Sequence, residues 1–80
     1  MRTVYLLQSL SNPSKRYIGR TEDLEKRLAD HDSGNSPYTA EHVPWKVVVA
    51  VNFENDAKAN AFERYLKQGT GHAFAKRHFW

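Results

Sequence analysis

The sequence contains no cysteine, so it offers neither a disulfide framework nor a thiolate site for a metal ion. It has no apolar run long enough to cross a bilayer, and residues 1–4 lack the pattern of a signal peptide. Internal repeats and low-complexity segments are absent as well. These absences predict a soluble, cytoplasmic protein that has no membrane partner.

The charge of the chain is modestly basic. Twelve Lys and Arg residues face nine Asp and Glu residues, which gives a formal net charge of +3. Such a surplus suits a polyanionic partner, although many proteins without nucleic-acid ligands share it. The basic residues gather around the expected second strand and near the C-terminal end: Lys15, Arg16 and Arg20 in the first group, and Lys67, Lys76, Arg77 and His78 in the second.

Three segments rich in β-branched and aromatic residues predict strands, over residues 3–8, 16–20 and 45–53. A loop containing Asn12-Pro13 joins the first two, so we expect them to form a hairpin. The third strand carries the continuous apolar run 47–51, which is typical of a strand covered on both faces.

Helical patterns occupy the rest of the chain apart from a loop over 35–44. The first helix is expected from Thr21, as N-cap, to about Ser33, with Gly34 ending it. A second runs from Asn55 or Asp56 to about Gln68, and a short basic helix follows a break at 69–71. The order ββαβαα predicts an α+β fold in residues 1–80, with a small antiparallel three-stranded sheet flanked by helices.

Two tyrosines lie on the predicted hairpin. With a side-chain period of two, Tyr17 and Gly19 share one face of their strand, and the glycine leaves that face open to a neighbouring group. In the next helix, Arg27 and His31 fall on the same stripe as Leu24 and Leu28. The pattern therefore predicts a guanidinium and an imidazole on the inward side of that helix, close to two phenols.

Taken in order, these segments resemble the GIY-YIG nuclease family, in particular small stand-alone members similar to the N-terminal nuclease domain of a bacterial excision-repair nuclease. Tyr17-Ile18-Gly19 matches the second motif, whereas Thr3-Val4-Tyr5 keeps only the tyrosine of the first. Leu24-x-x-Arg27-Leu28-x-x-His31 matches the helix motif, and Glu63 matches the glutamate of a later helix. The resemblance covers nearly the whole chain.

The resemblance implies an endonuclease that hydrolyses DNA phosphodiester bonds with a single Mg²⁺ or Mn²⁺ ion, with a structure-selective and repair-related role; RNA is not excluded as substrate. Carried over residue by residue, it places five residues in the catalytic site, with Glu63 also as the metal ligand: Tyr5, Tyr17, Arg27, His31 and Glu63.

The chemistry of these residue types fits that reaction. A carboxylate such as Glu63 is a hard oxygen ligand for an ion that keeps most of its waters. Arg27 can hold phosphate oxygens bidentately. Either Tyr5 or Tyr17 could orient or deprotonate the attacking water, and a base role needs a nearby cation, because a free phenol has a pKa of about 10. His31 could relay a proton or hold the phosphate.

Further residues are candidates for contact with substrate. Basic side chains could neutralise the phosphate backbone, and a tyrosine in the loop could touch the nucleic acid. These residues are Arg20, Tyr38, Lys67, Lys76 and Arg77.

Two other functions fit the sequence. The first is a non-catalytic nucleic-acid-binding module, favoured by the small size and by the missing glycine of the first motif. The second is a docking domain that uses the terminal aromatic residues, Phe74, Phe79 and Trp80, to bind another protein. Taken singly, each candidate residue also has a structural explanation, such as cross-strand packing of Tyr5 and Tyr17. The oligomeric state stays open.

Overall fold

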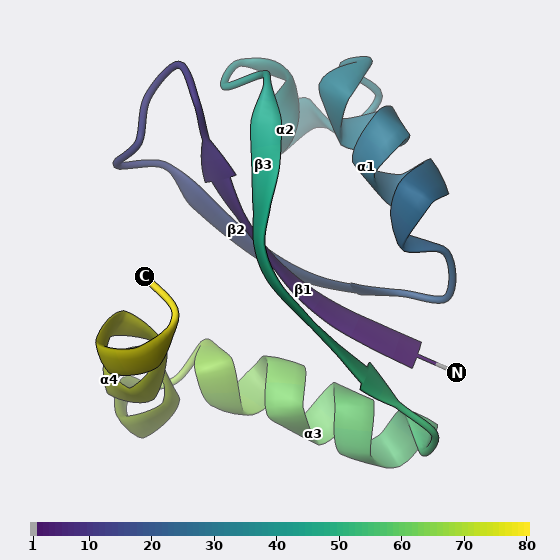
Figure 1. Ribbon diagram of the computed structural model, residues 1–80, viewed down its shortest axis with the longest axis vertical. Helices are drawn as coiled ribbons and strands as arrows, with labels where there is room; N and C mark the ends of the chain where they lie inside the picture. Colours follow the sequence, from purple (N-terminus) through teal and green to yellow (C-terminus); the bar gives the residue numbers. More distant parts are fainter. Residues whose placement is uncertain (1) are drawn as a thin grey trace.

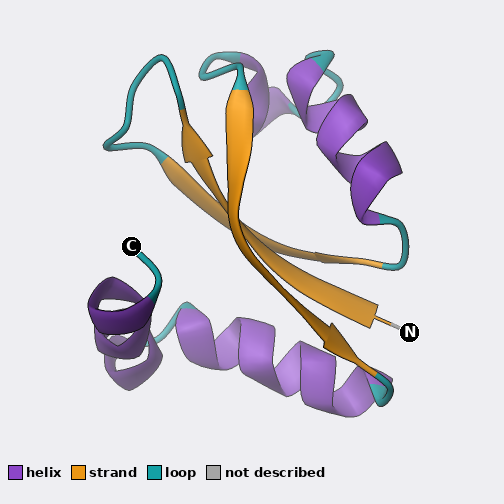
Figure 2. Cartoon of the chain, viewed as in Figure 1, coloured by secondary structure: helices purple, strands orange, loops and turns teal. Residues whose placement is uncertain are grey.

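The computed structural model describes residues 2–80 and confirms the α+β fold (Figure 1). Three strands form one antiparallel sheet, and the helices lie on its two faces (Figure 2). The strands are β1 (Arg2–Ser9), β2 (Arg16–Thr21) and β3 (Trp45–Phe53); the helices are α1 (Leu24–Asp32), α2 (Pro37–Ala40), α3 (Asp56–Leu66) and α4 (Gly69–His78). No helix in residues 2–80 is both long and apolar enough to span a membrane.

The sheet has the order β2-β1-β3, so β1 is its centre and β2 is an edge strand. The hairpin between β1 and β2 is in a register that places Tyr5 opposite Gly19 and Leu6 opposite Ile18. Between β1 and β3 the register shifts at Leu6 and Leu7, which indicates a bulge. The centre of the sheet is thus the first strand of the sequence, and its second strand borders solvent.

Side chains of β1 alternate between the two faces of the sheet and contribute to two separate cores. Val4 and Leu6 point to the face covered by α3 and α4, whereas Tyr5 and Leu7 point to the face covered by α1 and α2. The predicted cover on both faces therefore exists, but the strand buried throughout is β1. In β3, which lies at the other edge, Ala50 stays exposed despite the apolar run.

Two predicted helix boundaries were wrong. The N-cap of α1 is Asp23, whose side chain accepts from the Lys26 amide at 3.2 Å, while Thr21 still belongs to β2. Residues 69–71 do not break a helix; they form the start of α4. Gly71 allows this, because a Cβ there would collide with the Tyr65 carbonyl at the end of α3. The predicted end of α1 is confirmed, since Gly34 follows with a φ of 83°.

The predicted loop over 35–44 contains the short helix α2. Ser36 is its N-cap and Pro37 its first residue. A hydrogen bond from Trp45 holds the segment against the sheet, because the indole Nε1 donates to the Thr39 carbonyl at 2.9 Å. The Trp45 backbone amide donates to Asp32 at the end of α1 at 2.9 Å. The loop is therefore a fixed part of the structure.

Candidate active site

A buried hydrogen-bonded chain links the centre of the sheet to both helices above it. The Tyr5 hydroxyl lies 3.0 Å from His31 Nε2, and His31 Nδ1 lies 2.8 Å from Thr39 Oγ1. Because the Thr39 hydroxyl donates its one proton to the Ser36 carbonyl at 3.3 Å, it must accept from Nδ1–H. We therefore assign the neutral tautomer protonated at Nδ1, with Nε2 accepting from the Tyr5 hydroxyl.

The pKa values of this chain agree with that assignment. Burial lowers the pKa of His31, and the positive charge of Arg27 lowers it further, so the ring is neutral at neutral pH. Burial also raises the pKa of Tyr5 to about 12, against the opposing effect of its hydrogen bond to Arg27. Tyr5 is thus a protonated donor, and both ring nitrogens of His31 are already used. In this arrangement Tyr5 and His31 are positioning residues for the neighbouring side chains Arg27 and Tyr17.

Tyr17 is the phenol that borders the surface. Its ring lies beside Tyr5, with centroids 6.2 Å apart, and it meets His31 edge-on at 4.8 Å. Gly19 makes this packing feasible, because a Cβ there would lie 2.5 Å from the Tyr5 hydroxyl oxygen and 2.8 Å from the Tyr17 ring. The close approach expected at this glycine is confirmed: the neighbouring groups are the two phenols.

Arg27 brings a positive charge to both phenols. Hydrogen bonding to Tyr5 is the main cause that raises the pKa of Arg27; burial opposes the rise, and hydrogen bonding to Tyr17 supports it. The side chain comes from the inner stripe of α1, as predicted, and is partly buried. It can bind phosphate oxygens beside these phenols.

Glu63 belongs to α3 and therefore lies on the other face of the sheet from the phenols. Its carboxylate is only 15% exposed and forms two ion pairs, from Oε1 to Arg20 Nε at 3.5 Å and from Oε2 to Lys67 Nζ at 3.2 Å. Because β2 is an edge strand, the two faces meet around its open side. Arg20 follows Gly19 directly in β2, so the partner of Glu63 is adjacent in sequence to the glycine that contacts the phenols. The charge of Glu63 is among the smaller causes that raise the pKa of Tyr5.

The residues around Glu63 are few for the metal ion that the resemblance implies. Residues 2–80 contain no group of three or more His, Asp or Glu side chains that could enclose a metal. A single carboxylate nevertheless suits Mg²⁺, which is commonly held by one or two carboxylates and keeps several waters. Arg20 and Lys67 neutralise the carboxylate in the present arrangement, and the side chain of Lys67 is more than half exposed. The residues thus fit a single, mostly hydrated ion.

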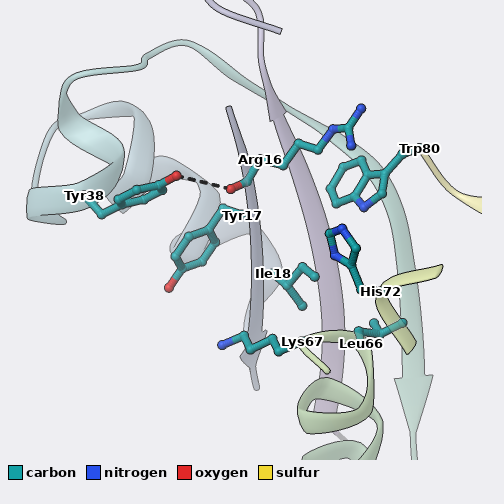
Figure 3. A pocket seen from close by; sticks show the side chains of 8 residues that line it. All are labelled: Arg16, Tyr17, Ile18, Tyr38, Leu66, Lys67, His72 and Trp80. Atoms are coloured by element: carbon teal, nitrogen blue, oxygen red, sulfur yellow. Dashed lines mark hydrogen bonds between the residues drawn. The ribbon is translucent and has the colours of Figure 1, made fainter. Parts of the chain in front are cut away.

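A cavity of about 430 Å³ lies along the open side of β2 and joins several of the candidates (Figure 3). Tyr17 and Lys67 line it, so the side chain that pairs with Glu63 shares a cavity with the surface phenol. Tyr38, from α2, lines it too, as the proposed substrate contact requires.

The remaining two substrate candidates lie elsewhere. Lys76 and Arg77 are exposed on α4, and Arg77 lines a different hollow together with Tyr65 and Phe74. The structure therefore brings Arg20, Tyr38 and Lys67 to the open side of β2. Arg77 faces a different hollow, and Lys76 lies on α4 one turn from His72, which lines the cavity. The terminal aromatics Phe74, Phe79 and Trp80 pack against the apolar core, which removes the support for a docking domain that presents them.

Several residues of the site were missed in the sequence. Thr39 orients His31, and Arg16, His72 and Trp80 line the cavity. One signal was available for Thr39: Ser36-Pro37 is a typical helix start and could have shown that a helix follows. No local pattern marks the other three, because the path of the chain brings them together.

Comparisons with known proteins found a family match and several relatives. The family model described as "GIY-YIG catalytic domain" matches residues 1–77. A UPF0213 protein of Lactococcus lactis subsp. cremoris is 46% identical over 52 residues, which are 64% of this chain and 53% of that protein. The UPF0213 protein YsiG of Lactococcus lactis subsp. lactis is 41% identical over 64 residues, or 79% of this chain and 60% of that protein. The chain thus spans between half and two thirds of these relatives.

Two further matches cover more of the chain. The structure-specific endonuclease subunit SLX1 of Candida dubliniensis is 35% identical over 82 aligned residues, which cover 94% of this chain and 27% of that protein. The solution NMR structure of a UPF0213 protein of Bacillus halodurans has a TM-score of 0.56 and 26% identity, and covers 95% of this chain and 81% of that one.

Proposed function

We propose that this chain, which belongs to the GIY-YIG family, is a metal-dependent endonuclease that hydrolyses DNA phosphodiester bonds. The observation that carries the proposal is the cluster at the open side of β2. There the guanidinium of Arg27 interacts with both phenols, Tyr5 and Tyr17. Lys67 lines the cavity beside Tyr17 and forms an ion pair with the carboxylate of Glu63. The name of the SLX1 relative, a structure-specific endonuclease subunit, supports a substrate chosen by its structure, and a place in DNA repair follows as part of the proposal.

Each residue has one role in the proposed reaction. Arg27 holds the non-bridging oxygens of the scissile phosphate and offsets the charge that develops on them. Tyr17, the phenol at the surface, orients the attacking water in line with the bond to be broken. Tyr5, His31 and Thr39 form the buried support that fixes Arg27 and Tyr17 in place. Glu63 holds a divalent ion, Mg²⁺ or Mn²⁺, which supplies Lewis acidity at the phosphate.

The test compares DNA nicking by the wild type, Glu63→Gln and Arg27→Ala, on plasmid and branched substrates, with Mg²⁺ or Mn²⁺. Each substitution should lower the rate by at least about a hundredfold, as expected for the loss of one group that stabilises a transition state. Matched controls are Glu54→Gln and Arg64→Ala, which change an exposed carboxylate and an exposed guanidinium away from the cluster. Equal rates in wild type, Glu63→Gln and Arg27→Ala would refute the proposal.

One observation favours the alternative of a non-catalytic nucleic-acid-binding module. Both oxygens of Glu63 already face cations, Arg20 and Lys67, which could make a metal unnecessary. Binding of Mn²⁺ followed by electron paramagnetic resonance separates the two functions. Under the nuclease proposal the wild type binds the ion and Glu63→Gln does not. Equal binding by both proteins, together with branched DNA that is bound but never cut, would establish the module.

A further inference from the structure

The cavity along β2 is larger than the proposed hydrolysis requires. It extends from Tyr17 and Lys67 past the start of β2 to the end of the chain, between α2 on one side and α4 on the other (Figure 3). Water and a phosphate group need only the part beside Tyr17. The whole cavity measures about 430 Å³, which is within the range of pockets that hold small organic molecules. Its lining residues are Arg16, Tyr17, Ile18, Tyr38, Leu66, Lys67, His72 and Trp80.

The walls of the cavity are aromatic and its floor is aliphatic. Tyr38 stands on the α2 side, with its side chain 50% exposed, and Trp80 stands across from it on the α4 side (Figure 3). Ile18 and Leu66 lie between them. A large exposed tyrosine next to an apolar floor is a stacking platform, and flat aromatic ligands such as nucleobases bind to platforms of this kind.

The charge of the lining indicates an anionic ligand. Arg16 and Lys67 are positive, and none of the eight lining residues is acidic. The Arg16 guanidinium lies 4.8 Å from the centroid of the Trp80 ring, a cation–π contact that holds both side chains at the rim. A nucleotide combines a flat aromatic ring with negative charge and therefore matches both features of the lining.

Tyr17 and Lys67 belong both to this cavity and to the proposed catalytic cluster. A base inside the cavity therefore belongs to a nucleotide next to the phosphate that reacts beside Tyr17 in the proposed function. Bases within a duplex are stacked on both faces and cannot enter, whereas an unpaired nucleotide can. Resting on the proposed function, we propose that the cavity binds an unpaired nucleobase beside the scissile phosphate, so that the enzyme selects junctions between double- and single-stranded DNA.

The experiment uses a DNA flap with 2-aminopurine at the first unpaired position, in EDTA so that binding is measured without cleavage. Its fluorescence should change when the wild type binds, because the base leaves water and stacks on Tyr38. Tyr38→Ala should weaken binding about tenfold, and an abasic site at the same position should weaken binding to the wild type equally. Combining the two changes should give no additional loss, since the ring and the base form one contact.

Two control variants accompany the measurement. Tyr38→Phe keeps the ring and should bind as the wild type does. Tyr65→Ala removes another exposed tyrosine, one that lies on α3 outside this cavity, and should also leave binding unchanged. Thermal melting of each variant confirms that it is folded.

The outcomes separate this proposal from the nuclease proposal. Equal affinity of the wild type for the base-containing and abasic flaps would overturn the nucleobase site, even if the protein cuts DNA. The same holds if the losses from Tyr38→Ala and from the abasic site simply add, or if no flap is bound at all. Base-dependent binding without cutting under any divalent ion would support the nucleobase site and refute the nuclease.

Discussion

The two faces of the sheet are built from the same strand but from different chemistry. On the face of α3 and α4, β1 contributes Val4 and Leu6, and the buried residues that meet them are aliphatic. On the face of α1 and α2, the same strand contributes Tyr5, and its buried neighbours include His31 and Thr39. The first core is held by apolar burial alone, and the second adds a buried hydrogen-bonded chain to its apolar residues.

The difference indicates that one face of the sheet mainly stabilises the fold and the other mainly fixes the geometry of the candidate site. Apolar burial is non-directional, so the lower core in Figure 1 can stabilise the fold without fixing the angle of any one group. Hydrogen bonds are directional, and a fully satisfied buried network holds its members in one geometry. The face that carries Tyr17 and Arg27 is the one that needs such a geometry. We expect substitutions on the two faces to separate stability from activity.

The largest effect on stability should come from the apolar face. Leu6→Ala removes a completely buried side chain from the central strand and should lower the free energy of unfolding by about 2–5 kcal/mol. The hydrogen-bonded chain is left intact, so the nicking rate per folded molecule should stay near that of the wild type. Urea unfolding and nicking assays at a temperature where the variant remains folded measure both quantities. A variant that is stable but inactive would contradict this difference between the two faces.

A smaller loss of stability and a larger loss of activity should follow from Thr39→Val. The substitution preserves the shape but removes the acceptor for His31 Nδ1–H, which is then buried without a partner. An unsatisfied buried donor costs about 1–3 kcal/mol. Because His31 in turn holds Tyr5, the phenols and Arg27 lose their fixed placement, and the nicking rate should fall at least about tenfold.

Thr39→Ser is the matched control, since it keeps the hydroxyl and loses only a methyl group. It should recover most of the nicking rate that Thr39→Val loses. If Thr39→Val and Thr39→Ser have the same rate, the hydroxyl does not position the site, and the contrast between the two faces concerns packing alone.

The sequence predicted the parts of the site that follow from local periodicity. The alternation in 16–20 put Tyr17 and Gly19 on one face, and the helical spacing of Arg27 and His31 put both on the inner stripe of α1. Because the helix begins directly after the hairpin, the short connection between them leaves few possible arrangements and brings these groups together. No comparable constraint applied to the C-terminal cations, and Arg77, which was predicted to contact substrate with Lys67, lines a different hollow from Lys67.

Other features depend on how distant segments meet. Glu63 lies on the α3 face of the sheet, and its relation to the phenols depends on β2 being an edge, which the sequence order does not reveal. Likewise, Arg16 meets Trp80 only because α4 packs against the C-terminal end of α3, and the absence of a side chain at Gly71 makes this close contact feasible. The same apolar run that suggested a fully buried third strand fits an edge strand with a bulge.

The smallest expected effect is a dependence of stability on pH that belongs to the hydrogen-bonded face alone. Burial lowers the pKa of His31 below its ordinary value of 6.5, so between that value and the lower folded-state value the unfolded chain binds a proton that the folded chain does not. The free energy of unfolding should therefore be constant just above pH 6.5 and fall as the pH decreases below it.

Two variants test whether His31 causes this slope. The exposed His72 lies outside the buried chain, so His72→Gln should keep the slope, whereas His31→Gln should be less stable throughout and lose the slope. Urea titrations between pH 5 and 8, with the ring signals of His31 followed by NMR, measure both. An unchanged slope in His31→Gln would show that the proton is taken up elsewhere, and the buried imidazole would then not distinguish one face of the sheet from the other.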